Sequence, residues 1–243
     1  MEKPIRLNIS RRHVLGQGLG LGLCALGTGV VGLALPKSAP AQSFGASDAA
    51  PADPPLSGEP ITVPAGAHDL TAYERRIVDV ARRELERQQA LLWRQDIVAV
   101  ADFARPSALP RIHFVDMEAG RLRSYLVAHG RGSDPDHSGW LERFSNTVGS
   151  EATSRGAYLT CACYEGKYGP SIRLRGLDAD NSNALDRAIV MHPAWYAASE
   201  MLPRYGKLGR SEGCFAMDPA DFSVALNQLA AGRLLFADRI GEG

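Results

Sequence analysis

Short apolar or alternating runs, broken by prolines and glycines, constrain the fold of this chain more than any other feature. They span residues 97–103, 112–117, 122–128, 157–164, 171–177, 188–192 and 234–237. Pro106, Pro110 and Gly120 separate the first three runs. Short runs at this spacing, with turn residues between them, are typical of strands in a mainly antiparallel sheet. We therefore predict one mainly β domain over residues 96–243, with peripheral helices.

Two helices are expected beside the strands. Thr71 and Glu74 have the spacing of a capping box, which marks the start of a helix. Apolar residues recur at helical spacing in the residues that follow, at Tyr73, Ile77, Ala81 and Leu85. This spacing predicts a helix within residues 69–95 that ends near Trp93. A second helix is predicted over 219–230, because Pro219 suits a first helical position.

The first 41 residues have the three-part layout of an export signal. A basic opening is followed by an uncharged run over 14–35 and by Ala39-Pro40-Ala41, a small-x-small cleavage site. Arg11 and Arg12 stand just before the run, and seven glycines dilute it, which favours the twin-arginine route. We predict a cleaved signal over 1–41 and a periplasmic protein that begins near Gln42.

Two alternatives to cleavage stay open. The uncharged run is long enough to span a bilayer as a permanent anchor, although its glycines and the cleavage site disfavour this. Cys24 could carry a lipid, although Leu23 stands before it where a small residue is expected.

Residues 42–68 are rich in proline and alanine and cannot bury enough apolar area to fold alone. We predict a disordered tether there.

The charge distribution excludes some partners. The whole chain is neutral, but residues 1–41 hold five basic residues and one acidic residue, which leaves 22 basic and 26 acidic residues in 42–243. A mildly acidic body lacks the basic surface that binding to nucleic acid or adhesion to anionic lipid requires. We expect a monomer that binds no nucleic acid and, once the signal is cleaved, has no stable insertion in a membrane.

The segment 206–217 carries the strongest chemical signal. Its sequence is GKLGRSEGCFAM, in which glycines flank Ser211 and Cys214 without any periodicity. A free thiol is only a few per cent ionised at neutral pH, so a nucleophilic cysteine needs a base such as an imidazole. Gly213 permits backbone geometries closed to other residues. Amide N–H groups near Gly213 and Cys214 could then face a developing oxyanion.

The base for Cys214 must come from elsewhere in the chain. His129 and His192 each end an apolar run and enter a loop, where a side chain is held rigidly yet exposed. The other histidines lie in the export signal, in the tether, in a polar loop or in the middle of a strand. On the residues alone, a buried structural cysteine and a packing histidine remain the alternative.

Cys161 and Cys163 share one face of a predicted strand. An oxidising compartment permits a disulfide, but a bridge between alternate residues of an extended strand is strained. We therefore expect two buried free thiols. A zinc site would lack a fourth ligand at a usual spacing, and we predict neither a metal nor a cofactor.

Taken together, several segments resemble the murein L,D-transpeptidase catalytic domain-like family, a divergent Gram-negative branch of the L,D-transpeptidases. Arg210-Ser211-x-Gly213-Cys214 is similar to the Ser-x-Gly-Cys motif of these enzymes, and His192 closes a strand upstream, as their histidine does. The divergent branch is indicated by VAHG at 127–130, FSN at 144–146, YEGKYG at 164–169, SIRLRGL at 171–177 and RAIVMH at 187–192. The motifs keep their order over residues 96–237.

The resemblance implies a β-sandwich-like transpeptidase domain in which Cys214 is the nucleophile and His192 the base, with Gly213 and Ser211 beside them. The thiolate would attack a peptidoglycan stem peptide, release D-alanine and form a thioester, which an amine of a second stem then resolves. In this family a backbone carbonyl commonly orients the histidine. Residues expected to contact the substrate are Arg210, His129, Tyr205 and Trp195.

Two positions depart from the better-known members of the transpeptidases. Ala216 stands where they carry arginine, and Glu212 where they usually carry histidine or asparagine. If that arginine grips a substrate carboxylate, Arg210 could substitute for it through its bidentate guanidinium. Two other functions stay open. One is an L,D-carboxypeptidase that uses water as acceptor, and the other is a non-catalytic wall-binding module with the same fold.

Overall fold

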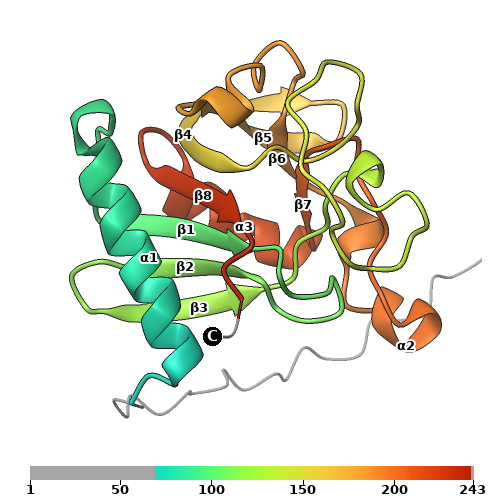
Figure 1. The fold of residues 1–243 in the computed structure, drawn as a ribbon, viewed down its shortest axis with the longest axis horizontal. Helices are drawn as coiled ribbons and strands as arrows, with labels where there is room; N and C mark the ends of the chain where they lie inside the picture. Colours follow the sequence, from blue (N-terminus) through green and yellow to red (C-terminus); the bar gives the residue numbers. More distant parts are fainter. Residues whose placement is uncertain (1–68, 242–243) are drawn as a thin grey trace, which may run out of the picture. The chain divides into compact units, whose positions relative to one another are not determined.

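The structure is a computed structural model that describes residues 69–241. The predicted export signal and tether lie outside the described residues. Eight strands form one mixed sheet in the order β3-β2-β1-β8-β4-β5-β6-β7 (Figure 1). The mainly β fold with an N-terminal helix is thus confirmed. The strands are β1 Ile97–Asp102, β2 Ile112–Asp116, β3 Arg121–Tyr125, β4 Gly156–Gly166, β5 Gly169–Gly176, β6 Val190–Pro193, β7 Phe215–Met217 and β8 Leu234–Asp238.

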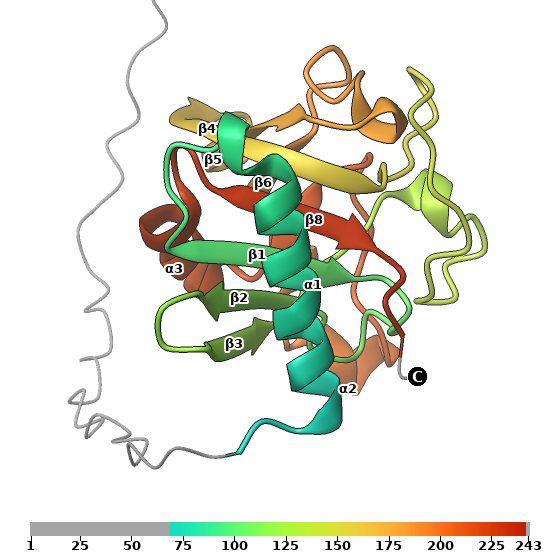
Figure 2. The same ribbon diagram turned by 60° about the vertical axis from the view of Figure 1, so that its left-hand side comes forward.

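Helices accompany the sheet on both faces. The α-helices of residues 69–241 are α1 Ala72–Gln88, α2 Met201–Tyr205 and α3 Pro219–Leu229, and the 3-10 helices are η1 Gln89–Leu91, η2 Arg131–Ser133, η3 Ala179–Asn181 and η4 Trp195–Ala197. Helix α1 lies across one face of the sheet, and α3 packs on the other side of β1 (Figure 2). No helix in this part of the chain is both long and apolar enough to cross a bilayer.

Helix α1 begins at the predicted capping box. The Thr71 Oγ1 accepts from the Glu74 N–H at 3.2 Å, and the Glu74 Oε2 accepts from the Thr71 N–H at 2.8 Å. These two bonds satisfy backbone donors that an open helix end would leave without partners. The α-helix ends at Gln88 and one 3-10 turn follows, so the helical segment stops at Leu91, two residues short of the predicted end.

Two of the strand pairings are parallel, although the sheet is otherwise antiparallel as predicted. Strand β1 pairs with β8, and β6 pairs with β7, in parallel. Parallel neighbours require a long crossover connection, and between β6 and β7 it is formed by residues 194–214, which include η4 and α2. This crossover returns the chain so that the segment before β7 lies beside β6.

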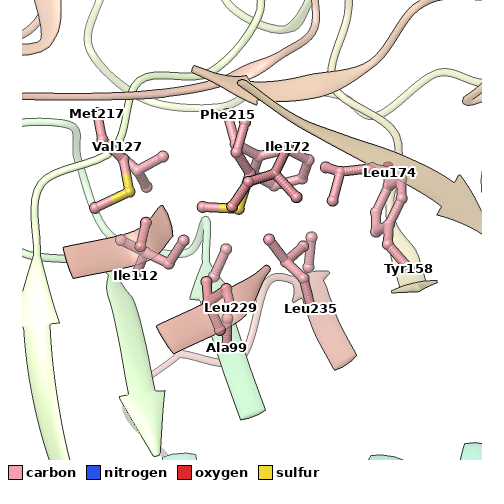
Figure 3. Packing of buried hydrophobic residues seen from close by; sticks show 14 of the residues in the cluster. Ala99, Ile112, Val127, Tyr158, Ile172, Leu174, Phe215, Met217, Leu229 and Leu235 are labelled. Carbon is pink, nitrogen blue, oxygen red and sulfur yellow. The ribbon is translucent and has the colours of Figure 1, made fainter. Parts of the chain in front are cut away.

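Side chains of the central strands alternate between two hydrophobic clusters. In β1, Ala99 and Ala101 face the larger cluster, whereas Val98 and Val100 face the smaller cluster beneath α1. The larger cluster also contains Ile112 of β2 and Ile172 of β5, which come from distant parts of the sheet. Their side chains point toward one shared interior (Figure 3). A single sheet therefore curls around its core, and this produces the sandwich-like packing.

Cys161 and Cys163 are free thiols, but the expectation that they are buried is wrong. Cys163 is exposed and Cys161 is half-buried. Strand β8 pairs with β4 only at residues 156–159, and the β4–β5 register shifts between Thr160 and Cys163. The second half of β4 therefore extends past its neighbour β8, which leaves these side chains partly uncovered.

Candidate active site

Two adjacent strands position the predicted nucleophile and base. In the β6–β7 ladder, Met191 lies opposite Phe215, and His192 lies opposite Ala216. Met191 and Phe215 point into the core. Because side chains alternate along a strand, His192 points to the other face. Cys214 stands directly before β7, and its side chain lines the same cavity as His192.

A cavity of about 650 Å³ opens there, a size typical of small-molecule sites. The predicted site residues that line it are Cys214, His192, Ser211 and Arg210. Other side chains in its wall come from the β4–β5 hairpin and from the loops around residues 131, 150 and 187. The structure thus brings together four residues that are distributed over two separate segments of the sequence.

Hydrogen bonding fixes the tautomer of His192. Its Nδ1 lies 2.9 Å from the carbonyl oxygen of Pro193. Since a carbonyl only accepts, Nδ1 carries the proton, and Nε2 of the neutral ring is an acceptor. Tyr168 stacks on the ring, with centroids 4.4 Å apart and planes 20° apart. Burial lowers the pKa of His192, against the effect of the Pro193 bond, so the ring is neutral near pH 7, as a base requires.

Cys214 is half-buried in the cavity wall. Its Sγ donates to the carbonyl oxygen of Ala188 at 3.7 Å. Burial is the main cause that raises the pKa of the Cys214 thiol, and Glu212 adds to it, while the Val190 N–H and Arg187 act in the opposite direction. The thiol is therefore protonated at rest and bonded to Ala188 rather than to His192. Ionisation by His192 requires the thiol to turn away from this carbonyl.

Ser211 and Gly213 shape the loop that carries Cys214. The Ser211 Oγ donates to the Cys214 carbonyl oxygen at 2.7 Å and accepts from the Gly213 N–H at 3.2 Å. Gly213 has a φ of +113°, and a Cβ there would lie 2.8 Å from Ile189 Cδ1 and 2.9 Å from the Ala152 carbonyl oxygen. Only glycine fits this position. Because the Gly213 amide is engaged within the loop, the Cys214 amide is the better candidate for an oxyanion donor.

Ala216, which stands where better-known transpeptidases carry arginine, has no room for a long side chain. It is fully buried in a small apolar cluster that includes Leu208. It lies between His192 of β6 and Ala128, to which it forms an isolated antiparallel bridge. Close packing at position 216 therefore leaves no space for an arginine side chain, and a substrate carboxylate would need a cation from elsewhere.

Arg210 is such a cation in the cavity wall. Its Nη1 donates to the carbonyl oxygens of Asp134 and Pro135, the latter at 3.0 Å. These bonds hold the side chain in place through one nitrogen of the guanidinium. The other nitrogens keep donors that a carboxylate can accept from.

His129 lies behind the cavity wall and does not line it. His129 is absent from the cavity lining, although it is as buried as His192, at 1% exposed. Its Nδ1 accepts from Arg111 Nη2 at 2.7 Å, and its Nε2 bonds the Asp134 carboxylate at 3.2 Å. Burial, reinforced by the Arg111 charge, lowers the pKa of His129 to about 3. The predicted substrate contact is corrected accordingly, because both ring nitrogens of His129 are bonded within the protein and its side chain does not line the cavity. The backbone carbonyl oxygen of His129 instead accepts a hydrogen bond from the Ser211 N–H at 2.9 Å.

Trp195 and Tyr205, the other predicted substrate contacts, also lie outside the cavity wall. They are exposed at 74% and 49%. Trp195 belongs to η4 and Tyr205 ends α2, both within the crossover between β6 and β7. Tyr196, directly after Trp195, lines the cavity in their place.

The cavity wall also contains residues that the sequence did not single out. Tyr168 covers His192, and Arg187 lies beside Cys214. Both fall in the segments YEGKYG and RAIVMH, which contributed only to the family resemblance. Their place in these motifs was the only sequence signal that could have pointed to a role for them in the site.

No group of three or more His, Cys, Asp or Glu side chains in residues 69–241 is arranged to hold a metal ion.

Residues 70–237 match the protein family described as L,D-transpeptidase catalytic domain. The match covers more than half of the chain, which therefore belongs to this family. The resemblance noted from the motifs is thus confirmed at the level of the family. Comparison with curated proteins found no match.

Several solved structures are similar to this chain at low identity. An L,D-transpeptidase from Mycobacterium smegmatis is 12% identical with a TM-score of 0.36, over 59% of this chain and 58% of that chain. An L,D-transpeptidase from Mycobacterium tuberculosis is 16% identical with a TM-score of 0.35, over 59% and 57%. A helical cell shape determining protein from Campylobacter jejuni is 11% identical with a TM-score of 0.39, over 71% and 58%. The chain thus spans less than three fifths of each of these proteins.

Proposed function

We propose that this chain is an exported cysteine acyltransferase that acts on peptidoglycan stem peptides, with Cys214 as nucleophile and His192 as base. One observation carries the proposal: in a member of the L,D-transpeptidase catalytic domain family, these two side chains line one cavity, His192 from β6 and Cys214 from the residue directly before the adjacent strand β7. The Pro193 carbonyl also leaves Nε2 of His192 available to take a proton. Export, by the twin-arginine route, rests on the sequence of residues 1–41.

The first half-reaction is acylation of the cysteine. The Cys214 thiol gives its proton to His192 Nε2, and the sulfur attacks the carbonyl carbon between the diamino acid and the terminal D-alanine. The Cys214 N–H stabilises the oxyanion. When the C–N bond breaks, His192 passes the proton to the leaving nitrogen. D-Alanine departs, and the stem remains attached through a thioester.

The second half-reaction decides the product. An amine of another stem attacks the thioester carbon, His192 takes one of its protons, and the sulfur leaves and is reprotonated. The new amide is a crosslink. When water takes the place of the amine, the same steps release a shortened stem, and the enzyme is an L,D-carboxypeptidase.

Arg210 is our candidate for binding a substrate carboxylate. It is the cavity-wall arginine closest in sequence to Cys214, and only its Nη1 is engaged by the loop at Asp134 and Pro135. It would take the place of the arginine that position 216 cannot accommodate. Arg131, another cavity arginine, is paired with Glu151.

The test is to incubate the purified protein with a disaccharide-tetrapeptide and to read the products by mass. Crosslinked dimers are expected for the transpeptidase, and trimmed tripeptides indicate the carboxypeptidase. Cys214→Ala should abolish both, whereas Cys163→Ser, which removes an exposed thiol that does not line the cavity, should abolish neither. A carbapenem should add its mass to the peptide that contains Cys214.

A non-catalytic wall-binding module is the competing function. It is favoured by the resting state of Cys214, whose pKa is raised by burial and whose thiol bonds Ala188. Binding to intact peptidoglycan without any product, and without a carbapenem adduct, would decide for this alternative and against the enzyme.

A further inference from the structure

We propose that Arg187 stabilises the thiolate of Cys214 as a fixed cation next to the nucleophile. This inference rests on the proposed function, because it concerns how that nucleophile ionises. Arg187 lies in the loop before β6 and lines the same cavity as Cys214. It acts through its charge and through its place in the loop, without itself reacting.

Two adjacent contacts place the guanidinium beside the thiol. The carbonyl oxygen of Ala188, directly after Arg187, accepts a hydrogen bond from the Cys214 Sγ at 3.7 Å. Gly213, directly before Cys214, lies so close to the guanidinium that a Cβ there would be 3.2 Å from Arg187 Nη2. The segments 187–188 and 213–214 therefore lie against each other. Burial raises the pKa of the thiol, and the Arg187 charge is one of the effects that oppose this rise.

The two terminal nitrogens at the end of the Arg187 side chain form all their hydrogen bonds within the protein. Its Nη1 donates to the Ser145 carbonyl oxygen at 2.7 Å and to the Ser154 Oγ at 2.5 Å. Its Nη2 donates to the Ser150 Oγ at 3.2 Å and to the Ala152 carbonyl oxygen. All four N–H groups of the two terminal nitrogens are thus used. Arg187 therefore cannot clamp a substrate carboxylate with this end, and what it supplies to the cavity is charge.

All four of these acceptors are neutral. No carboxylate among residues 69–241 forms an ion pair with Arg187. Burial lowers the pKa of Arg187, while the negative charges that Tyr158 and Cys214 acquire on ionisation would raise it. A partly buried cation without a counter-ion is unfavourable. A thiolate at Cys214 supplies the missing charge, so the cation shifts the thiol equilibrium toward ionisation.

Backbone strain occurs at the same place. Ala188 has a φ of +52° and Glu151 a φ of +53°, in the left-handed region that residues with a Cβ rarely adopt. Ala188 presents its carbonyl to the thiol, and Glu151 stands between Ser150 and Ala152, two residues that hold Arg187. Strain of this kind concentrates at functional sites. Here it occurs directly after Arg187 in the chain and within the segment 150–152, which binds the Arg187 Nη2.

The test measures the apparent pKa of the Cys214 thiol in the absence of any peptidoglycan substrate. The full chain is alkylated with iodoacetamide across a pH series, and modification of the Cys214 peptide is followed by mass. Arg187→Gln should raise the apparent pKa by about one unit, so that alkylation at neutral pH slows about tenfold. Glu212→Gln, which removes a nearby anion, should shift the pKa in the opposite direction.

Ser154→Ala is the matched structural control. It removes one hydrogen bond to the guanidinium and leaves the charge, so it should lower the melting temperature without moving the thiol pKa. An unchanged pKa in Arg187→Gln, or an equal shift in Ser154→Ala, would overturn the inference. If the glutamine variant does not fold, citrulline in place of Arg187 removes the charge with little change of shape, and the same readings apply.

Product formation from the disaccharide-tetrapeptide is scored separately in the same preparations. If the wild-type protein forms no product but its thiol pKa depends on Arg187, the proposed function fails and the role of Arg187 stands. If product forms and the pKa does not depend on Arg187, the proposed function stands and this inference fails.

Discussion

Ala216 lies directly opposite His192 in the parallel β6–β7 ladder, with its side chain fully enclosed. The position that better-known transpeptidases give to a cation is here packed into a small apolar cluster beside β6. A charged residue placed there would be buried without a partner, and it would displace the strand that holds His192.

Restoring that arginine should therefore damage the protein rather than improve it. We expect Ala216→Arg to lower the free energy of unfolding by about 3 kcal/mol or more, from overpacking and an unpaired buried charge. Ala119→Arg, at an exposed turn between β2 and β3, should change it by less than about 0.5 kcal/mol. Urea unfolding measures both, and a fully stable Ala216→Arg protein would contradict the packing described at this position.

Gly213 and Gly206 provide a matched pair of glycines with positive φ. Gly213 has no space for a Cβ, whereas nothing lies within 4 Å of the position where a Cβ of residue 206 would stand. Gly206→Ala should lower the free energy of unfolding by only about 1 kcal/mol, as is usual for a residue with a Cβ in the left-handed region. Gly213→Ala should lower it clearly more and should abolish acylation of Cys214 by a carbapenem. Equal losses in the two variants would show that the Gly213 loop can relax.

Tyr168 should control the proton affinity of His192. Its ring stacks on the imidazole, and burial lowers the pKa of His192. Tyr168→Ala uncovers the ring, so the pKa should rise toward its ordinary value, and less neutral base should remain at mildly acidic pH. Tyr168→Phe keeps the stacked ring and should leave the pKa in place. Titration of the histidine signals by NMR distinguishes the two variants, and identical titrations would contradict a covering role.

Buried histidines should make the fold sensitive to acid. Burial lowers the pKa of His129 to about 3 and that of His113 to about 4, from an ordinary 6.5. Below pH 6.5 the unfolded chain therefore binds protons that the folded chain does not. The contribution of these histidines to the free energy of unfolding should be fully present above pH 6.5. Below that pH, the free energy of unfolding should fall toward pH 4 by about 1.4 kcal/mol per pH unit for each histidine.

Urea unfolding across this pH range measures the slope. His129→Gln should remove the share of His129 from the slope, whatever it does to the absolute stability. A slope that stays the same in this variant would show that His129 does not enter the unfolding equilibrium as a buried neutral group.

Local sequence patterns predicted most of the strands, because each strand carries its own apolar run and its own turn residues. The run 112–117 became β2, and 234–237 became β8. Strand β7 was missed because three residues are too few to show a period. Helix α2 was missed for a similar reason, with five residues and an internal Pro203. The two parallel pairings were also missed, since they depend on where a crossover returns and not on local composition.

The proposed nucleophile and base, Cys214 and His192, could be picked out from the sequence because each stands in a motif of the family. His129 was not distinguishable from His192 on pattern alone, since both end an apolar run. What separates them is Arg111, which lies 18 positions before His129 in the sequence, donates to its ring and is itself fully buried. Such a contact between side chains of separate segments appears only once the chain is folded.

The alternation along β1 has a consequence for how this protein can change in length. Ala99 and Ala101 face the core, and Val98 and Val100 face α1. One inserted residue in this strand would exchange the pairs, forcing branched side chains into space shaped for methyl groups and leaving gaps beneath the helix. Insertions are therefore tolerable in the turns, while the central strands have a fixed number of residues.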